Sequence, residues 1–269
     1  MPPRFGLSTR IVHDAALDAG HISLFARYGF TTLELAATRT HLDYANPEAL
    51  RNLRTWLADA GATLHAVRAP RADGLRGRTW VAPFSLSSDD GAERRKALDE
   101  AKLALAVAQT LPFDVLAVHL ERPRGTDGAA AESPGSARRS LEDLATAASD
   151  LGVRLALVSG GGPISTPESL VRIIELDLED STAGICLDFA QAQSQGGVVD
   201  AIEEASEHLT AALLPTEGSI DWGAAMMGIQ KIGYDGVLLF DVPRGEHLEA
   251  TLQRTDRARQ RLDDLLRIF

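Results

Sequence analysis

Short apolar runs typical of buried β-strands alternate with helical patterns from one end of the chain to the other. A strand that is covered by helices on both faces has a continuous apolar sequence, because neither face meets water. The alternation therefore favours βα units and a parallel sheet. The strand-like runs lie at residues 5–8, 32–35, 64–69, 115–120, 153–158, 184–187, 209–214 and 237–240. Eight strands fit a closed barrel, so we predict a single α/β domain, a (βα)8 TIM barrel, over residues 1–269.

Residues with known capping preferences mark the expected helices between these runs. Asn46 and Thr166 are each followed by a proline, which is the pattern of a helix start. Asp90 and Glu93 have the spacing of a capping box, in which each side chain bonds a backbone amide of the other. The apolar residues of the segment 97–108 recur at helical spacing, so we expect a long amphipathic helix after this cap.

The charge and cysteine content exclude several classes of function. The formal net charge is -11 and no basic run or basic-aromatic stripe is present, which argues against nucleic acid or an anionic membrane as the main partner. A small neutral ligand or a local basic pocket remains compatible with this charge. The single cysteine excludes an intramolecular disulfide and any multi-cysteine metal site, and we interpret Cys186 as a small core residue.

The sequence contains no apolar stretch of membrane-spanning length, and its start lacks the pattern of a signal peptide. We therefore expect a cytoplasmic protein without a membrane anchor. The outer helices could support a homodimer, although no residue identifies an interface.

Asp188 is the first candidate for a site residue, because the apolar run within 183–191 stops abruptly at this carboxylate. Reactive groups of barrel enzymes collect at the carboxyl ends of the strands. Side chains two apart on a strand share a face, so Cys186 should point the same way as Asp188, one layer deeper. The alternative is that Asp188 caps the backbone amides of the residues that follow it.

Three stretches are expected to form loops or turns at the carboxyl face. The first, 69–88, carries or adjoins Trp80 and the arginines Arg68, Arg71, Arg76 and Arg78. These arginines could clamp a phosphate or carboxylate, but solvated loop charges are the commoner interpretation. The second stretch, 121–136, is rich in proline, glycine and alanine. The third, 159–162, could cradle an anion with its amides, although an ordinary turn is favoured.

The closing stretch 217–223, with the segment IQKIGYDGVLLFD at 229–241, resembles the end of the sugar phosphate isomerase/epimerase family, the xylose-isomerase-like TIM barrels. Other segments align with the same family in the same order: 28–35 with Glu34, Arg68 with the following Ala-Pro, Val118 with His119, and 185–188. The resemblance covers nearly the whole chain. It implies a (βα)8 barrel with its pocket at the carboxyl ends of the strands.

Members of this family hold a divalent metal ion with residues at the ends of strands five to eight, and most of that pattern is broken here. Val158 stands where the family has a glutamate, and 209–215 contains neither histidine nor aspartate. Asp188 keeps its place, Gln191 replaces the histidine three residues later, and Asp241 replaces the last glutamate. A hard divalent ion needs several oxygen or imidazole ligands. We therefore predict no cofactor and no metal ligands, with Mn²⁺ or Mg²⁺ disfavoured.

Arg68 stands where the family has a strand-three histidine, so it brings a fixed positive charge towards the expected pocket. We hypothesise that this charge partly replaces the metal ion and pairs with Asp188, Asp241 or an anionic ligand.

Isomerisation or epimerisation next to a carbonyl needs a base, an acid and a positive charge for the enediolate oxygen. The resemblance leaves Glu34 or Asp241 for the base, His119 for the acid or an orienting donor, and Arg68 for the electrophile. The alternatives are a hydrogen-bonded core histidine at His119 and an internal salt bridge at Glu34. The predicted substrate-binding residues are Arg68, Asp188, Gln191 and Trp80, and Trp222 could offer a second stacking face. The histidines treated as surface or core residues are His13, His21, His41, His208 and His247.

Two functions remain open at this point. The first is an enzyme that acts on a sugar, a related polyol or its phosphate by proton transfer without a tightly bound metal. The second is an inactive relative that binds a small polar metabolite or a partner protein. DNA repair of the AP-endonuclease kind belongs to the same superfamily, but it needs several metal ions and a basic groove that the sequence does not supply. Fold analogy alone does not assign an activity.

Overall fold

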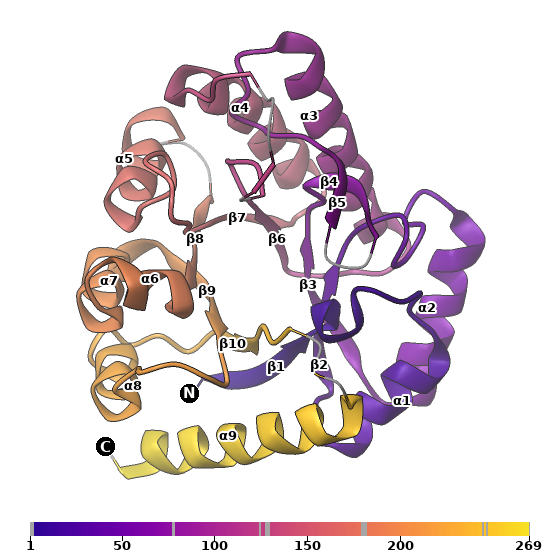
Figure 1. Cartoon of the computed structure of the whole chain (residues 1–269), viewed down its shortest axis with the longest axis vertical. Helices are drawn as coiled ribbons and strands as arrows, with labels where there is room; N and C mark the ends of the chain where they lie inside the picture. The colour runs from indigo at the N-terminus through magenta and orange to yellow at the C-terminus, as the bar shows by residue number, and fades with distance from the viewer. Residues whose placement is uncertain are drawn as a thin grey trace.

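The computed structural model describes residues 3–76, 79–123, 125–126, 130–178, 182–243, 245 and 247–268. Within these residues, parallel strands close into a barrel in the order β1, β10, β9, β8, β7, β6, β3, β2. Figure 1 shows this ring of strands at the centre with the helices around it. The barrel strands are β1 (Arg4–Ser8), β2 (Thr32–Ala36), β3 (Thr63–Arg68), β6 (Val115–Val118), β7 (Arg154–Val158), β8 (Gly184–Asp188), β9 (Leu209–Leu214) and β10 (Val237–Phe240). Each predicted strand is present, so the TIM-barrel prediction is confirmed.

The α-helices of the described residues are α1 (Ala19–Arg27), α2 (Pro47–Asp59), α3 (Gly91–Leu105), α4 (Pro134–Asp150), α5 (Pro167–Asp177), α6 (Phe189–Gln195), α7 (Val198–Glu204), α8 (Trp222–Lys231) and α9 (Leu248–Ile268). Short 3₁₀ helices are η1 (Thr9–Val12), η2 (Ala106–Gln109) and η3 (Ser206–His208). The side chains of Asn46 and Thr166 accept amide hydrogen bonds at the starts of α2 and α5, as predicted. No helix in the described part of the chain is long and apolar enough to cross a membrane.

The capping box predicted before α3 is half formed. Asp90 is the N-cap, and its Oδ1 accepts hydrogen bonds from the amides of Ala92 and Glu93. Glu93 does not return the bond to Asp90, because both of its carboxylate oxygens accept from Arg122 of the loop after β6. The amide of Asp90 donates to Ser88 Oγ instead.

The residue period of two along each strand explains which side chains reach the barrel mouth. One buried cluster fills the barrel interior, and it contains Ala66, Val115, Ala117, Ala156, Val158, Cys186, Ala211, Leu213, Val237 and Leu239. A second, larger cluster joins the outer strand faces to the helices. Cys186 lies in the inner cluster two residues before Asp188, and Leu239 lies there two residues before Asp241. The next inward position of each strand therefore opens onto the carboxyl end.

The stretch 69–88 was expected to be a loop, and this expectation is wrong for part of it. The strands β4 (Ala72–Arg76) and β5 (Thr79–Pro83) pair in antiparallel register as a separate hairpin. The hairpin follows β3 in the chain and is a sheet separate from the closed barrel (Figure 1). Arg78 lies outside the described residues, as does part of the stretch 121–136. The hairpin matters for the site because it carries Trp80 over the barrel mouth.

Candidate functional site

A cavity of about 560 Å³ opens at the carboxyl ends of the barrel strands. Its wall includes residues from the strand ends, the hairpin and the loops that follow β6 and β7. The predicted site residues that line it are Arg68, Trp80, His119, Asp188, Gln191 and Asp241. Glu34 is fully buried and does not line the cavity. All of the predicted site residues except Glu34 therefore line the cavity.

Arg68 and Glu34 form a bidentate ion pair beneath the cavity. Arg68 Nε donates to Glu34 Oε1 at 2.8 Å and Nη2 donates to Oε2 at 2.6 Å. Glu34 alternates with the outward-facing Leu33 and Leu35, so its side chain points into the barrel, where an unpaired carboxylate would be costly. Both oxygens of Glu34 are occupied by this pair. The geometry is therefore that of the internal salt bridge. Glu34 is poorly placed to act as the predicted base, because both of its oxygens are bonded to Arg68.

Asp241 receives the remaining donors of this network. Its Oδ2 accepts from Arg68 Nη1 at 3.0 Å and from Arg10 Nη1 at 2.8 Å. Burial opposes ionisation of Asp241, but Arg68 and Arg10 outweigh it and lower the pKa of the carboxyl. The other oxygen, Oδ1, is buried and has no hydrogen-bond partner among the described residues. Buried polar atoms in native proteins are rarely left in this state, so a donor from a ligand would suit Oδ1.

Asp188 combines the two interpretations that its sequence position left open. Its Oδ1 accepts from the amides of Ala190 and Gln191 at 2.9 and 3.1 Å, so it caps α6. Its own amide donates to Ser159 Oγ at 2.8 Å. Oδ2 makes no hydrogen bond within the described part of the chain and is not shielded from water. Burial and the charge of Asp241 raise the pKa of the Asp188 carboxyl.

His119 follows β6 and lines the cavity without a hydrogen bond to any described residue. Its ring is therefore not the hydrogen-bonded core histidine that the sequence allowed. Burial lowers the pKa of His119 well below its usual value, and Arg71, Arg68 and Arg10 lower it further. The imidazole is neutral at neutral pH, and it can accept a proton or donate one to a ligand in the cavity.

The structure also places in the cavity wall a histidine that the sequence analysis treated as surface or core. His13 lies 6.0 Å from the Trp80 ring, measured between ring centroids, and its Nε2 is 2.9 Å from Thr38 Oγ1. Burial, followed by His41, Arg10 and Arg68, lowers the pKa of His13 to about 3. His41 is a core residue, as expected.

Arg10 and His13 were not predicted as site residues, although a signal for them existed. Both follow β1 directly, on or just after the 3₁₀ helix η1, and residues that follow a barrel strand belong to the carboxyl face. The predicted first strand ends at Ser8, and no function was predicted for the turn that follows it.

The two remaining candidates, Gln191 and Trp222, differ in whether they reach the cavity. Gln191 lines the cavity, and its Oε1 is buried without a partner among the described residues. Trp222 does not line the cavity, and its ring lies 6.2 Å from that of Phe189 in a stacked arrangement. The suggestion that Trp222 offers a stacking face to a sugar is therefore wrong.

The residues just after the glycine turn at 159–162 hold the Glu121 carboxylate of the chain itself. Ser165 Oγ donates to Glu121 Oε2, and the amide of Ile164 donates to Glu121 Oε1 at 3.3 Å. A Cβ on Gly162 would come within 2.0 Å of Glu121 Oε1, so the turn needs glycine to admit this carboxylate. The turn is an internal docking point for Glu121.

The metal ion implied by the family resemblance does not fit these residues. No group of three or more histidine, cysteine, aspartate or glutamate residues in the described ranges is arranged to hold an ion. Asp241 Oδ2 is bound by two guanidinium groups, and Asp188 Oδ1 is bound by amides. The Arg68 guanidinium places a fixed positive charge against Asp241, and that charge would repel a divalent cation.

Comparison with known proteins agrees with the architecture. The sequence matches the family model of the xylose isomerase-like TIM barrel over residues 22–267. No curated protein matches the chain. Among solved structures, a D-tagatose 3-epimerase-like protein is similar with a TM-score of 0.78 and 18% identity, and the match covers 98% of each chain.

Two further solved structures show the same likeness. L-ribulose 3-epimerase has a TM-score of 0.78 at 18% identity, covering 99% of this chain and 95% of the other. D-allulose 3-epimerase from Methylomonas sp., in complex with D-allulose, has a TM-score of 0.75 at 17% identity, covering 98% and 94%. At such low identity these structures establish the shared fold and not a shared substrate. The family match extends over nearly the whole chain, and the chain therefore belongs to the xylose isomerase-like TIM barrel family.

Proposed function

We propose that this protein binds a small polyhydroxylated metabolite, a sugar or a related polyol, at the carboxyl end of its barrel. We further propose that its chemistry is proton transfer next to a carbonyl without a tightly bound metal ion. The structural neighbours that are sugar epimerases support the substrate class by analogy. The observation that carries the proposal is the cavity itself, in which a buried arginine is fixed against Asp241 and unpaired acceptors remain.

The open carboxylate oxygen in the cavity is Oδ2 of Asp188, which suits the role of base. It would take the proton from the carbon next to the ligand carbonyl, and the electron pair of that bond would move to the carbonyl oxygen. Arg68 and Arg10 supply positive charge near the developing enediolate. The Asp188 carboxyl, now protonated, would return the proton to the carbon, and His119, which is neutral and unbonded, would donate a hydrogen bond to the enediolate oxygen.

Asp241 and Gln191 suit binding better than proton transfer. Asp241 Oδ1 and Gln191 Oε1 are buried acceptors without partners in the described residues, so hydroxyl groups of a ligand would satisfy them. Asp241 was predicted as a base, and we now propose that it accepts a ligand hydrogen bond, because its lowered pKa makes it a weak base.

A second candidate function is binding without catalysis, and it is favoured because most carboxylate oxygens of the site already accept hydrogen bonds from the protein itself. Glu34 is fully engaged by Arg68, and one oxygen each of Asp188 and Asp241 is also engaged. A protein that had exchanged metal catalysis for ligand binding would show the same pairs.

Hydrogen exchange separates the two functions. The metal-free protein is incubated with a panel of ketoses in deuterated water, and loss of the proton next to the carbonyl is followed by NMR. We expect exchange with at least one sugar, and we expect Asp188→Asn to abolish it, since asparagine keeps the helix cap but is not a base. Asp221→Asn is the matched control, because Asp221 caps α8 in the same way but lies outside the cavity.

Each outcome of this experiment decides between the alternatives. Binding of a sugar without exchange favours the binding protein. Exchange that persists in Asp188→Asn shows that another group is the base. Exchange that requires added Mn²⁺ would contradict the metal-free mechanism.

A further inference from the structure

Arg71 lies in the cavity wall as a cation without an ion-pair partner among the described residues. It follows β3 by a short turn, and its side chain is partly buried. The guanidinium makes one hydrogen bond within the described part of the chain, from Nη2 to the backbone oxygen of Glu121 at 2.8 Å. Its Nε is buried without a partner, while Nη1 is unbonded and not shielded from water. Arg71 therefore presents donors that the described residues leave unused.

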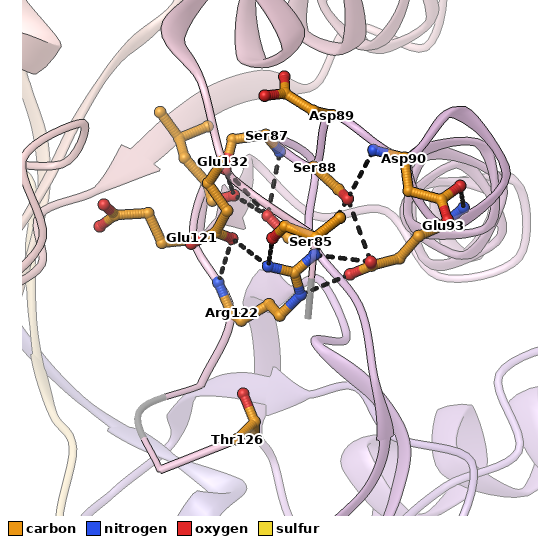
Figure 2. A network of polar contacts seen from close by, with 12 residues as sticks. Ser85, Ser87, Ser88, Asp89, Asp90, Glu93, Glu121, Arg122, Thr126 and Glu132 are labelled. Atoms are coloured by element: carbon orange, nitrogen blue, oxygen red, sulfur yellow. Dashed lines mark hydrogen bonds and ion pairs between the residues drawn. The ribbon is translucent and has the colours of Figure 1, made fainter. Parts of the chain in front are cut away.

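The carboxylates nearest to Arg71 are already engaged elsewhere. Glu121 is held by Ser165 and by the amide of Ile164. Glu132 Oε1 accepts from the amide of Arg122 at 2.8 Å and lies 3.6 Å from its Nη1. Figure 2 shows Glu132 bonded to Arg122 and the Glu121 carboxylate directed away from Arg122. Both oxygens of Glu121 and one oxygen of Glu132 are thus engaged elsewhere, and neither carboxylate forms an ion pair with Arg71 within the described residues.

Two neighbouring positive charges make the environment of Arg71 more favourable for an anion. Burial, followed by Arg68 and Arg10, lowers the pKa of Arg71 to about 10, so it remains charged at neutral pH. Arg68 and Arg10 form ion pairs with Glu34 and Asp241, whereas Arg71 forms no ion pair within the described residues and Glu121 and Glu132 offset its charge only in part. An unpaired charge in a desolvated position is unfavourable, and it persists in proteins mainly where a ligand supplies the counter-charge.

We propose that Arg71 binds an anionic group of the ligand, a carboxylate or a phosphate monoester, through Nη1. The substrate class is then an anionic sugar derivative, with its polyol part against Asp188, His119 and Asp241. This inference rests on the proposed sugar-binding function and narrows it. The guanidinium geometry suits both anions, because each offers oxygens that can accept two parallel hydrogen bonds.

The test compares three probes of similar carbon skeleton: D-fructose, D-fructose 6-phosphate and D-gluconate. Binding is measured by calorimetry at low ionic strength for the wild type, Arg71→Gln and Arg71→Lys. We expect at least one anionic probe to bind ten-fold or more tightly than D-fructose. Arg71→Gln should remove that advantage, and Arg71→Lys should retain part of it. Arg76→Gln is the matched control, since Arg76 is exposed on the hairpin that follows Arg71 and lies outside the cavity.

A second readout does not depend on the choice of probe. Because Arg71 is a buried cation without an ion-pair partner among the described residues, Arg71→Gln should raise the thermal midpoint of the free protein above that of the wild type. Saturating inorganic phosphate should raise the wild-type midpoint more than that of Arg71→Gln.

The outcomes separate the two proposals. Preference for D-fructose 6-phosphate or for D-gluconate identifies the anion as phosphate or carboxylate. Equal binding of neutral and anionic probes, or anion binding unchanged in Arg71→Gln, overturns the role of Arg71 and leaves sugar binding intact. If no probe binds and phosphate does not stabilise the wild type preferentially, both proposals fail.

Discussion

Two buried arginines of the cavity wall, one at the end of β3 and one in the loop after the neighbouring β6, illustrate the difference between a structural and a functional polar cluster. Arg122 bonds both oxygens of Glu93, Ser88 Oγ and the backbone oxygen of Ala130 (Figure 2). Arg68 bonds both oxygens of Glu34 and one oxygen of Asp241. The side chains of the two arginines are almost equally buried, at 7% and 8% exposed.

The difference lies in what remains unpaired around each arginine. The cluster around Arg122 contains no buried side-chain atom without a partner in the described residues, and it joins α3 to the loops before α3 and after β6. The cluster around Arg68 leaves Asp241 Oδ1 without a donor. A satisfied network stabilises one conformation, whereas an incomplete one is prepared for a further partner. The unpaired atoms therefore distinguish the candidate site from the structural clamp.

The largest expected effect comes from removing Arg68. Arg68→Met leaves Glu34 charged, unpaired and fully buried, so we expect a loss of about 3 to 5 kcal/mol in the free energy of unfolding. Urea unfolding measures this loss. The double variant Glu34→Leu with Arg68→Met should recover most of it, because no buried charge then lacks its partner. A loss below about 1 kcal/mol, as for a surface ion pair, would show that water reaches Glu34.

Arg122→Met should have a smaller effect, because its partners can reach water. Glu93 and Glu132 are 20% and 23% exposed, whereas Glu34 is 0% exposed. We expect a loss of about 2 to 3 kcal/mol in the free energy of unfolding, also measured in urea. The affinity for neutral sugars should change little. A loss equal to that of Arg68→Met would remove the distinction between the two clusters.

The sequence predicted the barrel and the inward positions of the site because both depend on local patterns. Apolar runs located the strands, and their ends located Asp188, His119 and Asp241. The partners of these residues depend on contacts between distant segments. Glu93 was expected to bond Asp90, and it bonds Arg122, which is 29 residues away in the chain. The hairpin of β4 and β5 was missed because its strands are only partly buried and therefore lack a continuous apolar run.

The dependence of stability on pH should report on the buried His41, whose ring centroid lies 5.5 Å from that of His13 in the cavity wall. Burial lowers the pKa of His41 to about 4 from an ordinary value of 6.5. His41 Nδ1 donates to the carbonyl of Ala15 at 2.8 Å, so its Nε2 accepts from the Thr9 hydroxyl at 3.0 Å and the ring is neutral. Above pH 6.5 neither the folded nor the unfolded state binds a proton here, so this group adds no pH dependence.

Between pH 6.5 and about pH 4 the unfolded chain binds a proton at His41, whereas the folded protein does not. The free energy of unfolding therefore decreases as the pH is lowered through this window. In His41→Gln we expect the slope to be shallower by up to about 1.4 kcal/mol per pH unit. Urea unfolding across this window measures the slope. An unchanged slope would mean that His41 is protonated in the folded protein.

The smallest effect should come from Gly162→Ala, which tests whether the placement of Glu121 beside the glycine turn keeps Arg71 free to bind an anion. The new Cβ would displace the Glu121 carboxylate from Ser165 and Ile164, at a cost of about 1 to 2 kcal/mol in the free energy of unfolding. A displaced Glu121 carboxylate would become available to Arg71, so inorganic phosphate should bind more weakly, as measured by calorimetry. Gly135→Ala is the control, because its Cβ would meet nothing within 4 Å. Unchanged phosphate binding in Gly162→Ala would mean that the displaced carboxylate does not reach Arg71, and that the anion site is independent of the turn.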